Sequence, residues 1–507
     1  MQTSKRHELE EKVVRTKTPA IPGLWIVFLG LFALSVTPTG AQIPAGSSTT
    51  TTTTTEQGTS TQTQTVFQTP PVGVFSGSAR LDKVTPDVLK ISILDAIDRG
   101  IRHNLGLLLS QEQTQAARAQ YRRSLSALLP NVTGRATDSI QQINLAAFGI
   151  PLPAGLTSPV VGPFNVVDAR AAFTQTLVDF NAINRLHQSA ENEKAAKFTL
   201  ADARELVVLV VGNQYLQTQA AASRLQTSKT QLQTAQTIFR QTQDQKNAGV
   251  AAGIDVLRAQ VQMQTQQQRV LSAQDQYEQQ KMAMGRIIGL HVAQKYELTD
   301  PVPYGPSPAI DLESSLKRAY EQRPEFLAAE ARNRALELAV RAAKGELLPS
   351  VEINGDYGVL GTRFGTMENT YTFSAGVRIP IFQGGRARAD VAQAESDLRQ
   401  SRLQLEDLRN RIEVDVRSAL LDVNTSAEQV GVAQSSIGLA AEQLKQSQDR
   451  FAAGVAGTLD VVQAQEAVAT ANESYIQALY LNNIAKLTLA RALGVAEERT
   501  KAFLGGK

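Results

Sequence analysis

Two stretches near residue 360 alternate apolar and polar side chains with a period of two, which is typical of β-strands. They cover residues 350–360 and 370–382, with a loop at 361–369. One predicted face is apolar and carries Val351, Ile353, Tyr357, Val359, Tyr371, Phe373, Val377 and Ile379. The other face is polar and carries Glu352, Asn354, Asp356 and Arg378. The pattern predicts a hairpin with two unlike faces.

A weaker pattern of the same kind predicts a second hairpin earlier in the chain, with strands at about 130–148 and 164–180. Ala169, Ala171 and Phe173 alternate with polar neighbours there, but Gln175 interrupts the apolar face. The two hairpins together give four strands per chain.

The remaining pattern is helical and unusually long. Helices are predicted at about 185–247, 254–289, 386–452 and 458–493, and a shorter one at 312–347 ends before Pro349. Residues 386–452 contain no proline, and their apolar residues recur at spacings of three, four and seven: Leu398, Leu405, Leu408, Ile412, Val416, Leu420 and Val423. At 1.5 Å per residue this helix is roughly 100 Å long, so it needs a coiled or tubular setting.

The chain also repeats itself once. Residues 248–260 reappear in similar form as residues 453–465, and Leu128-Leu129-Pro130 reappears as Leu347-Leu348-Pro349. We therefore predict a tandem structural repeat, with one copy at 87–297 and the other at 310–495. A proline-rich linker at 298–309 joins them, and a short tail follows at 496–507.

The N-terminus has the features of an export signal. Basic residues precede an apolar run at 24–36, which at about 13 residues is too short for a transmembrane helix. Residues 1–41 are therefore predicted to be a signal peptide, the alternative being an uncleaved anchor. Residues 42–86 are rich in Thr, Ser, Gln and Pro and are predicted to be a disordered tether.

Composition argues against several classes of function. The net charge is +3 over 507 residues, which gives no concentrated basic face for a nucleic acid. There is no cysteine, the four histidines are scattered, and no zinc or phosphate-loop motif is present. We therefore expect no enzyme activity, no cofactor and no metal site.

A soluble, half-buried hairpin would show the same alternation, so three further features bear on the choice. The strands are long enough to cross a bilayer at a tilt, and Tyr357, Tyr371 and Phe373 lie near the loop as in an interfacial girdle. The export signal places the chain outside the cytoplasm. An open four-stranded sheet cannot lie in lipid, whereas three chains would close twelve strands around a wet lumen lined by the polar face.

These features resemble the TolC-like outer membrane factors, also called the outer membrane efflux protein family. The resemblance covers about residues 89–495 and rests on the duplicated Leu-Leu-Pro junction, the strand end at 379–386 and the twin Ala-Gly-Val turns. It implies a mixed α and β membrane protein: a homotrimer with a 12-stranded transmembrane β-barrel, continued by a long periplasmic α-helical barrel. It also implies a periplasmic adaptor protein and an inner-membrane pump or ABC exporter as partners. The absence of cysteine excludes the lipidated members.

The family places the twin turns at the periplasmic tip. Gly249, Gly253, Gly454 and Gly457 are then expected to allow the tight reversals, with adaptor docking at the same place. The resemblance implies a periplasmic aperture at Asp255, Asp460 and Gln463, in which three copies of Asp460 form an acidic ring and the neutral Gln463 rules out a second one. The alternative is that each aspartate only complements the dipole of the helix that it starts. Phe451 and Ala456 stand where some relatives carry polar locking residues.

Two readings of function remain at this point. The favoured one is a passive outer-membrane duct for efflux or type I secretion, with a drug, a metal or a protein as the transported substrate. The alternative is a periplasmic or surface coiled-coil structural protein without a pore, which would need no lipid-facing hairpins.

Overall fold

The structure is a computed structural model that describes residues 73–79, 82–149, 158–300, 305 and 311–498. The described residues all belong to the second of two units of the chain, residues 1–69 and 70–507. The first unit lies wholly outside the described residues, and with it the predicted signal peptide and most of the predicted tether. Most of the linker and of the C-terminal tail also lie outside them.

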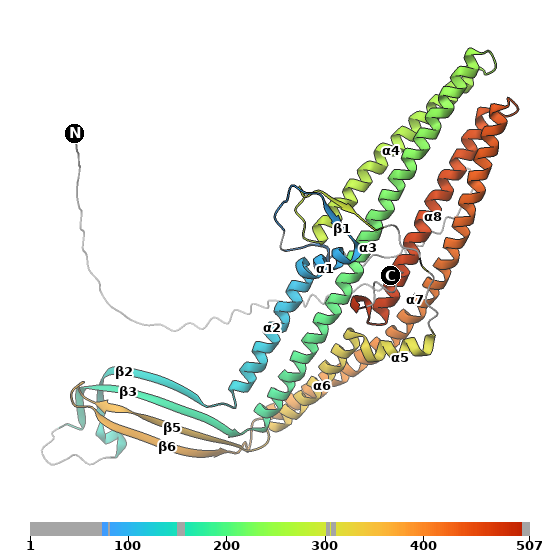
Figure 1. Cartoon of the computed structure of the whole chain (residues 1–507). Helices are drawn as coiled ribbons and strands as arrows, with labels where there is room; N and C mark the ends of the chain where they lie inside the picture. The colour runs from blue at the N-terminus through green and yellow to red at the C-terminus, as the bar shows by residue number, and fades with distance from the viewer. Residues whose placement is uncertain (1–72, 80–81, 150–157, 301–304, 306–310, 499–507) are drawn as a thin grey trace, which may run out of the picture. The chain divides into compact units, whose positions relative to one another are not determined.

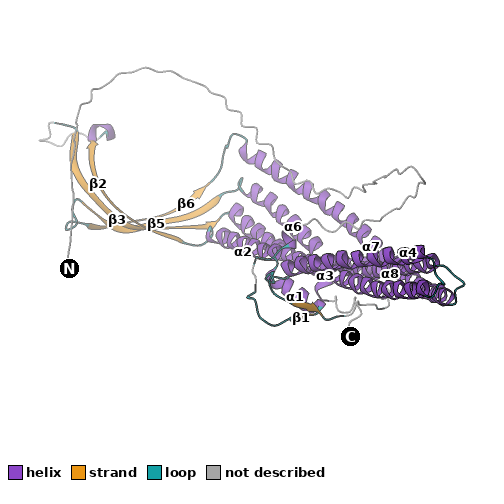
Figure 2. Ribbon diagram, turned by 90° about the horizontal axis from the view of Figure 1, so that it is seen from above, coloured by secondary structure: helices purple, strands orange, loops and turns teal. Residues whose placement is uncertain are grey.

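Four antiparallel strands form one sheet at one end of the second unit (Figure 1). They are β2 (Asn131–Asn144), β3 (Val160–Val178), β5 (Ser350–Gly361) and β6 (Glu368–Arg378), in the spatial order β2-β3-β5-β6. The two hairpins join through β3 and β5, so segments about 190 residues apart in sequence share one sheet. Seen from above, the strands bend together into an arc (Figure 2).

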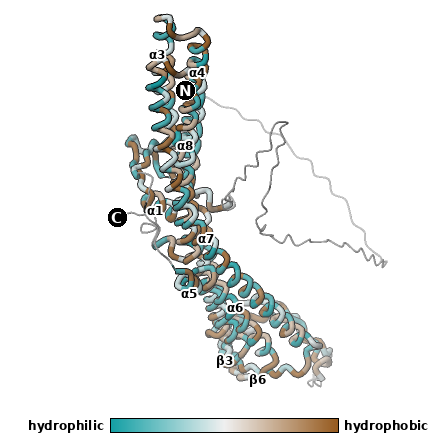
Figure 3. Tube along the Cα trace, turned by 90° about the vertical axis from the view of Figure 1, so that its right-hand side faces the viewer, coloured by the Kyte–Doolittle hydropathy of each residue, from teal (hydrophilic) through white to brown (hydrophobic). Residues whose placement is uncertain are grey.

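Two long helical hairpins extend from the other side of the unit. The first consists of α3 (Phe180–Asn247) and α4 (Gly253–Ile287), and the second of α7 (Arg386–Ala452) and α8 (Thr458–Ala492). Figure 3 shows apolar and polar residues interspersed along all four helices. Among the helices that the structure describes, none combines the length and apolarity needed to cross a membrane.

Shorter elements surround the middle of these helices. They are α1 (Ile93–His103), α2 (Leu105–Ser126), α5 (Leu312–Gln322), α6 (Pro324–Gly345), the 3-10 turns η1 (Val74–Ser76) and η2 (Leu145–Phe148), and two parallel strands, β1 (Leu89–Ile91) and β4 (Tyr296–Leu298). The main core lies where α1 and the middle of α3 meet α7 and the ends of α4 and α8. Tyr215, Met284, Ile412 and Leu489 are fully buried there. A side chain at Gly212 would clash with Leu487, so this glycine lets α3 and α8 approach closely.

The prediction of one continuous helix over 312–347 is wrong. Arg323 has an extended conformation (φ −65°, ψ 114°) and separates α5 from α6. The cause is Pro324, whose ring disfavours a helical conformation at the preceding residue and fits the first position of a new helix. The break is held in place by ion pairs from Arg323 to Glu325 and Asp415.

The predicted disorder of residues 42–86 is also wrong for the part that the structure describes. Ser78 donates a hydrogen bond to the carbonyl of Arg286, and the backbone N–H of Thr85 donates to Gln294. The start of the predicted tail is likewise attached, because the N–H of Ala496 donates to the buried carboxylate of Glu205. The composition of these segments could not reveal this order, because the residues that they contact lie far away in the sequence.

The strand and helix bounds differ from the predictions by a few residues. β2 ends at Asn144, where a 3-10 turn begins, and β3 begins at Val160, before the predicted start at 164. β6 ends at Arg378, since Pro380 cannot donate to a strand neighbour. α3 begins at Phe180 because the carboxylate of Asp179 accepts hydrogen bonds from the N–H groups of Asn181 and Ala182.

Candidate functional site

The apolar side chains predicted for one sheet face lie on one face of the sheet. The register sets Tyr357 opposite Tyr371 and Val351 opposite Val377. Tyr371 is 79% exposed and Phe373 71%, and the following side chains are also exposed: Tyr357, Val377 and Ile379. Val351, Ile353 and Val359 are half-buried, and Ile379 lies just beyond the end of β6. Large exposed apolar side chains in this number are unusual on a soluble surface.

Two further residues of that face were missed by the sequence analysis. Val132 and Ile140 on β2 are exposed, and the register places them on the same face as Phe173 and Ala171. The alternation in β2 is hard to detect, because small or polar residues, Gly134 and Asp138, stand between the apolar ones. The register of β2 against β3 is what identifies Val132 and Ile140 as part of this face.

The opposite face of the sheet carries charges that pair with one another. Arg170 on β3 contacts Asp168 at 2.7 Å and Asp356 at 2.9 Å, and the second contact bridges the two hairpins. Arg378 on β6 lies 3.1 Å from Glu352 on β5. Asn354 pairs in register with Thr174 and Ser374, which are also polar. The sheet therefore separates a largely apolar face, on which Asn165 donates a hydrogen bond to Asp138, from a charged, hydrogen-bonding face.

The two helical hairpins end in turns with the same geometry. In the first turn, the N–H of Gly249 donates to the carbonyl of Lys246, and the N–H of Val250 donates to the carbonyl of Gln245. In the second turn, the N–H of Gly454 donates to the carbonyl of Phe451, and the N–H of Val455 donates to the carbonyl of Arg450. Gly249 (φ 77°) and Gly454 (φ 74°) lie in the left-handed region, as in a Schellman helix end. The repeated sequence thus encodes a repeated turn.

Of the four tip glycines expected to allow the reversal, only two have a backbone conformation that favours glycine. Gly253 is the first residue of α4, and Gly457 precedes α8 with a φ of −85°. A Cβ at Gly253 would meet nothing within 4 Å. Neither conformation is restricted to glycine, so only Gly249 and Gly454 carry the backbone requirement.

Asp255 and Asp460 occupy equivalent positions in the first turns of α4 and α8, but their surroundings differ. Asp255 is partly buried and lies 3.4 Å from Arg258. Asp460 is exposed and forms no ion pair with a residue that the structure describes; Gln463 is exposed one turn later. Neither helix start has a side-chain cap, so both carboxylates complement the dipole from inside the first turn.

Phe451 was expected to replace a polar residue at the tip, and the structure places it in an apolar contact. It is buried with Ile238 of α3 and Val461 of α8, and Leu444 packs against them. We call these four residues the tip cluster. Through it, the two hairpins touch near their turns.

Comparison with known proteins decides which family the chain belongs to. The sequence profile described as "Outer membrane efflux protein" matches residues 97–290 and 315–495, which is well over half of the chain. The chain belongs to the outer membrane efflux protein family. This is a family of channel proteins and not of enzymes, and a member of it is an outer-membrane channel component of an efflux system.

Individual members of the family agree with this assignment. The outer membrane protein OprJ of Pseudomonas aeruginosa is 25% identical over 411 residues, covering 78% of this chain and 83% of OprJ. Two solved structures have the same fold. VceC of Vibrio cholerae matches with a TM-score of 0.68 at 16% identity, over 80% of this chain and 97% of VceC. The open-state MtrE channel of Neisseria gonorrhoeae matches with a TM-score of 0.68 at 17% identity, over 83% and 95%.

Proposed function

We propose that three copies of this chain form a passive duct, in which twelve strands close a barrel in the outer membrane and the long helices continue it into the periplasm. The observation that carries the proposal is the curved sheet, whose outer strands β2 and β6 have one strand partner each within the described chain. Unpaired strand edges cannot lie in lipid, so the apolar face requires closure. Three copies are the smallest set that leaves room for a wet lumen.

The two faces of the sheet then have distinct roles. The apolar face, with Tyr357, Tyr371 and Phe373 near the loop, is assigned to lipid. The charged face, with Glu352, Asn354, Asp356 and Arg378, is assigned to the lumen. Its ion pairs support this assignment, because charges on a lipid-facing surface cost several kcal/mol at the bilayer centre.

The helices carry a second argument for contact between copies. Five apolar residues on α7 are between 64% and 72% exposed: Leu403, Val414, Leu421, Val432 and Leu439. Their spacings of seven and eleven place them on one face of the helix. We call them the α7 stripe and propose that the neighbouring copy covers it.

At the other end of the duct, Asp460 and Gln463 are proposed to line the aperture. Three exposed Asp460 carboxylates would attract cations and impede anions. Asp255 contributes less because Arg258 partly neutralises it. The turns at Gly249 and Gly454 are the proposed docking place for a periplasmic adaptor, which connects the duct to an inner-membrane pump. The proposed substrate classes are a drug, a metal or a protein, carried by an efflux or a type I secretion system.

The two repeats are proposed to run over 87–297 and 310–495. Two observations support this division: the equal hydrogen bonding of the two tip turns, and the two separate segments matched by the family profile.

The experiment that tests the duct is the mass and conductance of the purified protein. We expect a detergent-held trimer that conducts ions across a planar lipid bilayer. A monomer, or a trimer that never conducts, would refute the proposal. Fractionation separates the alternative, since a coiled-coil structural protein would leave the membrane in high salt, whereas the duct requires detergent.

A further inference from the structure

Four helices share a polar cavity close to where they meet the sheet. α2, α3, α6 and α7 each begin or end beside the sheet (Figure 1), and together they line a cavity of about 590 Å³. Three of these helices contribute a pair of lining residues four positions apart. The pairs are Gln120 and Ser124 of α2, Ala339 and Ala343 of α6, and Arg386 and Asp390 of α7. The cavity therefore marks one side of each of these three helices.

An arginine stands midway in each pair: Arg122 on α2, Arg341 on α6 and Arg388 on α7. Two positions along an α-helix correspond to a turn of about 200°, so each arginine points to the side opposite the cavity. All three arginines are exposed. Each lies within roughly 6 Å of the sheet-facing end of its helix, at 1.5 Å per residue. Each helix thus presents a guanidinium group close to the sheet.

These arginines have no counter-charge in the part of the chain that the structure describes, because none of the three forms an ion pair there. Two acidic residues, Glu337 and Glu395, lie one or two turns farther along on the same side. Arg402 and Lys344 already bind them, each at 2.9 Å. This side of the helices consequently carries an excess of positive charge.

The sequence repeat supplies two of the arginines at equivalent positions. Residues 122–130 and 341–349 are identical only at the arginine and at the final Leu-Leu-Pro. Leu129 and Leu348 are exposed, and each follows its arginine by seven residues, about two helical turns, on the same side. In both repeats the N–H of this leucine donates to a carbonyl three residues earlier, that of Ser126 or Gly345, which continues the helical turn. Each repeat thus places an apolar side chain between the arginine and the sheet.

The arginines and leucines continue the apolar face of the sheet. Val132 and Val351 follow the leucines by three residues at equivalent positions, and both lie on that face. The order from helix to sheet is therefore arginine, leucine, valine in each repeat. A surface in contact with a lipid leaflet has this order, because apolar side chains meet the acyl chains and basic side chains reach the phosphates. The arginine face is defined here as the following five residues: Arg122, Leu129, Arg341, Leu348 and Arg388.

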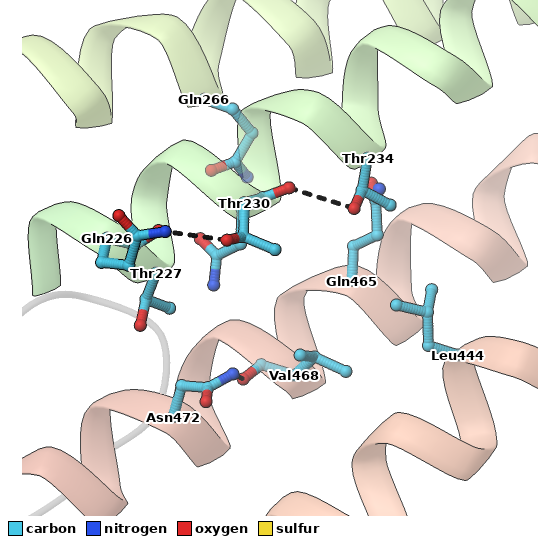
Figure 4. Close-up of a pocket in the computed structure, with 10 residues that line it drawn as sticks. Gln226, Thr227, Thr230, Thr234, Gln266, Leu444, Gln465, Val468 and Asn472 are labelled. Atoms are coloured by element: carbon cyan, nitrogen blue, oxygen red, sulfur yellow. Dashed lines mark hydrogen bonds between the residues drawn. The ribbon is translucent and has the colours of Figure 1, made fainter. Parts of the chain in front are cut away.

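A groove between the two helical hairpins provides a contrast. Figure 4 shows that Gln, Thr and Asn side chains make up most of its lining. None of its lining residues is charged, so no guanidinium group is available there to bind a phosphate. Of these two surfaces, only the arginine face has the charge that an anion requires.

We propose that the arginine face is a docking surface for the headgroups of anionic glycerophospholipids in the leaflet that faces the periplasm. The guanidinium groups bind the lipid phosphates, for which their planar fork is suited, and the two leucines contact the adjoining acyl chains. A zwitterionic lipid carries its own ammonium group beside the phosphate, so arginines without a counter-charge favour a lipid with a net negative charge. The inference rests on the proposed function, because it takes the apolar face of the sheet as the surface in lipid.

Native mass spectrometry of the detergent-held protein tests the lipid preference. The protein is mixed with equal amounts of phosphatidylglycerol and phosphatidylethanolamine that have the same acyl chains. We expect phosphatidylglycerol to exceed phosphatidylethanolamine severalfold among the lipids bound to the wild type. Arg122→Gln, Arg341→Gln and Arg388→Gln should each lower this ratio by about twofold, and the triple variant should bind both lipids nearly equally. A wild type without preference, or a triple variant that retains it, would overturn the proposal.

Arg386→Gln is the matched control. It removes the same charge two residues from Arg388, but on the cavity side, and should retain the wild-type lipid ratio. An equal loss in this variant would assign the preference to the total charge of the chain, against the proposal. An excess of glycerol 3-phosphate should leave the lipid bound, because it lacks acyl chains for the two leucines to contact. Displacement by it would exclude a lipid as the occupant.

The oligomeric state separates this proposal from a contact between copies. The triple variant should keep the trimer mass in lipid-free detergent, because the three arginines are exposed in the single chain. Loss of the trimer would assign the arginine face to a neighbouring copy and overturn the lipid. The duct fails separately, through a monomeric or non-conducting wild type, whereas a conducting wild-type trimer without lipid preference refutes only the arginine face.

Discussion

At the residue scale, the two tip aspartates show how equal sequence positions acquire unequal roles. Asp255 and Asp460 follow the same turn in the repeat, but only Asp255 has an arginine within reach. The sequence could indicate both as candidates because the two turns align. It could not rank them, since ranking requires the distance to Arg258 and the exposure of each carboxylate.

The ranking gives a prediction for ion selectivity. Asp460→Ala should lower the preference of the channel for cations severalfold, because each carboxylate in a water-filled pore contributes up to about 1 kcal/mol. Asp255→Ala should have a smaller effect, since it removes a charge that is already paired. Reversal potentials in a salt gradient across planar bilayers measure both. Equal effects, or an unchanged potential for Asp460→Ala, would remove Asp460 from the aperture.

Glu205 carries a second prediction at this scale. Desolvation raises the pKa of its carboxyl, although the N–H groups of Glu497 and Ala496 oppose the shift. A raised pKa in the folded state means that this group stabilises the fold most below its unfolded value of about 4.5 and loses that contribution as the pH rises. The melting temperature of the wild type relative to Glu205→Gln should therefore increase from pH 7 to pH 5. A constant difference would contradict this account.

At the element scale, local patterns predicted most of the elements, and distant contacts decided the rest. The bounds of α7 follow from an apolar stripe without proline, and Ile412, Val416 and Val423 on that stripe are buried as expected. The pairing of β3 with β5 could not be read from either strand, because it joins two repeats. The break at Arg323 was visible in principle, as Pro324 follows it directly.

The tip turns give a prediction about stability, in which a second glycine of the same turn serves as the control. Gly454→Ala should destabilise the α7/α8 hairpin by about 1–2 kcal/mol, because a side chain is unfavourable at positive φ. Gly457→Ala, at negative φ, should be nearly neutral. Denaturant unfolding compares the two variants, and similar losses would contradict the geometry described here. Gly454→Val should in addition weaken cross-linking to the adaptor, and normal cross-linking would remove this turn from the docking surface.

At the scale of the whole molecule, the sequence predicted the closed assembly from strand arithmetic, but it did not indicate which helical surface joins the copies. The predicted stripe on α7 faces the chain's own interior, where Leu408, Ile412, Val416 and Val423 are buried. The exposed α7 stripe lies on another face of the same helix. A periodic apolar pattern identifies an apolar face of a helix, but it does not indicate which face contacts a neighbouring copy of the chain.

The α7 stripe therefore yields the prediction for assembly. Leu421→Asp combined with Val432→Asp places two carboxylates where an apolar contact is proposed, and burying an unpaired charge is strongly unfavourable. We expect the variant to fold, because both side chains are exposed in the single chain, but to lose trimer in detergent as measured by native mass spectrometry. Gln429→Asp, exposed on α7 outside the stripe, should remain trimeric. A stable trimer of the double variant would place the contact between copies elsewhere, since the sheet edges alone would then suffice to hold three chains together.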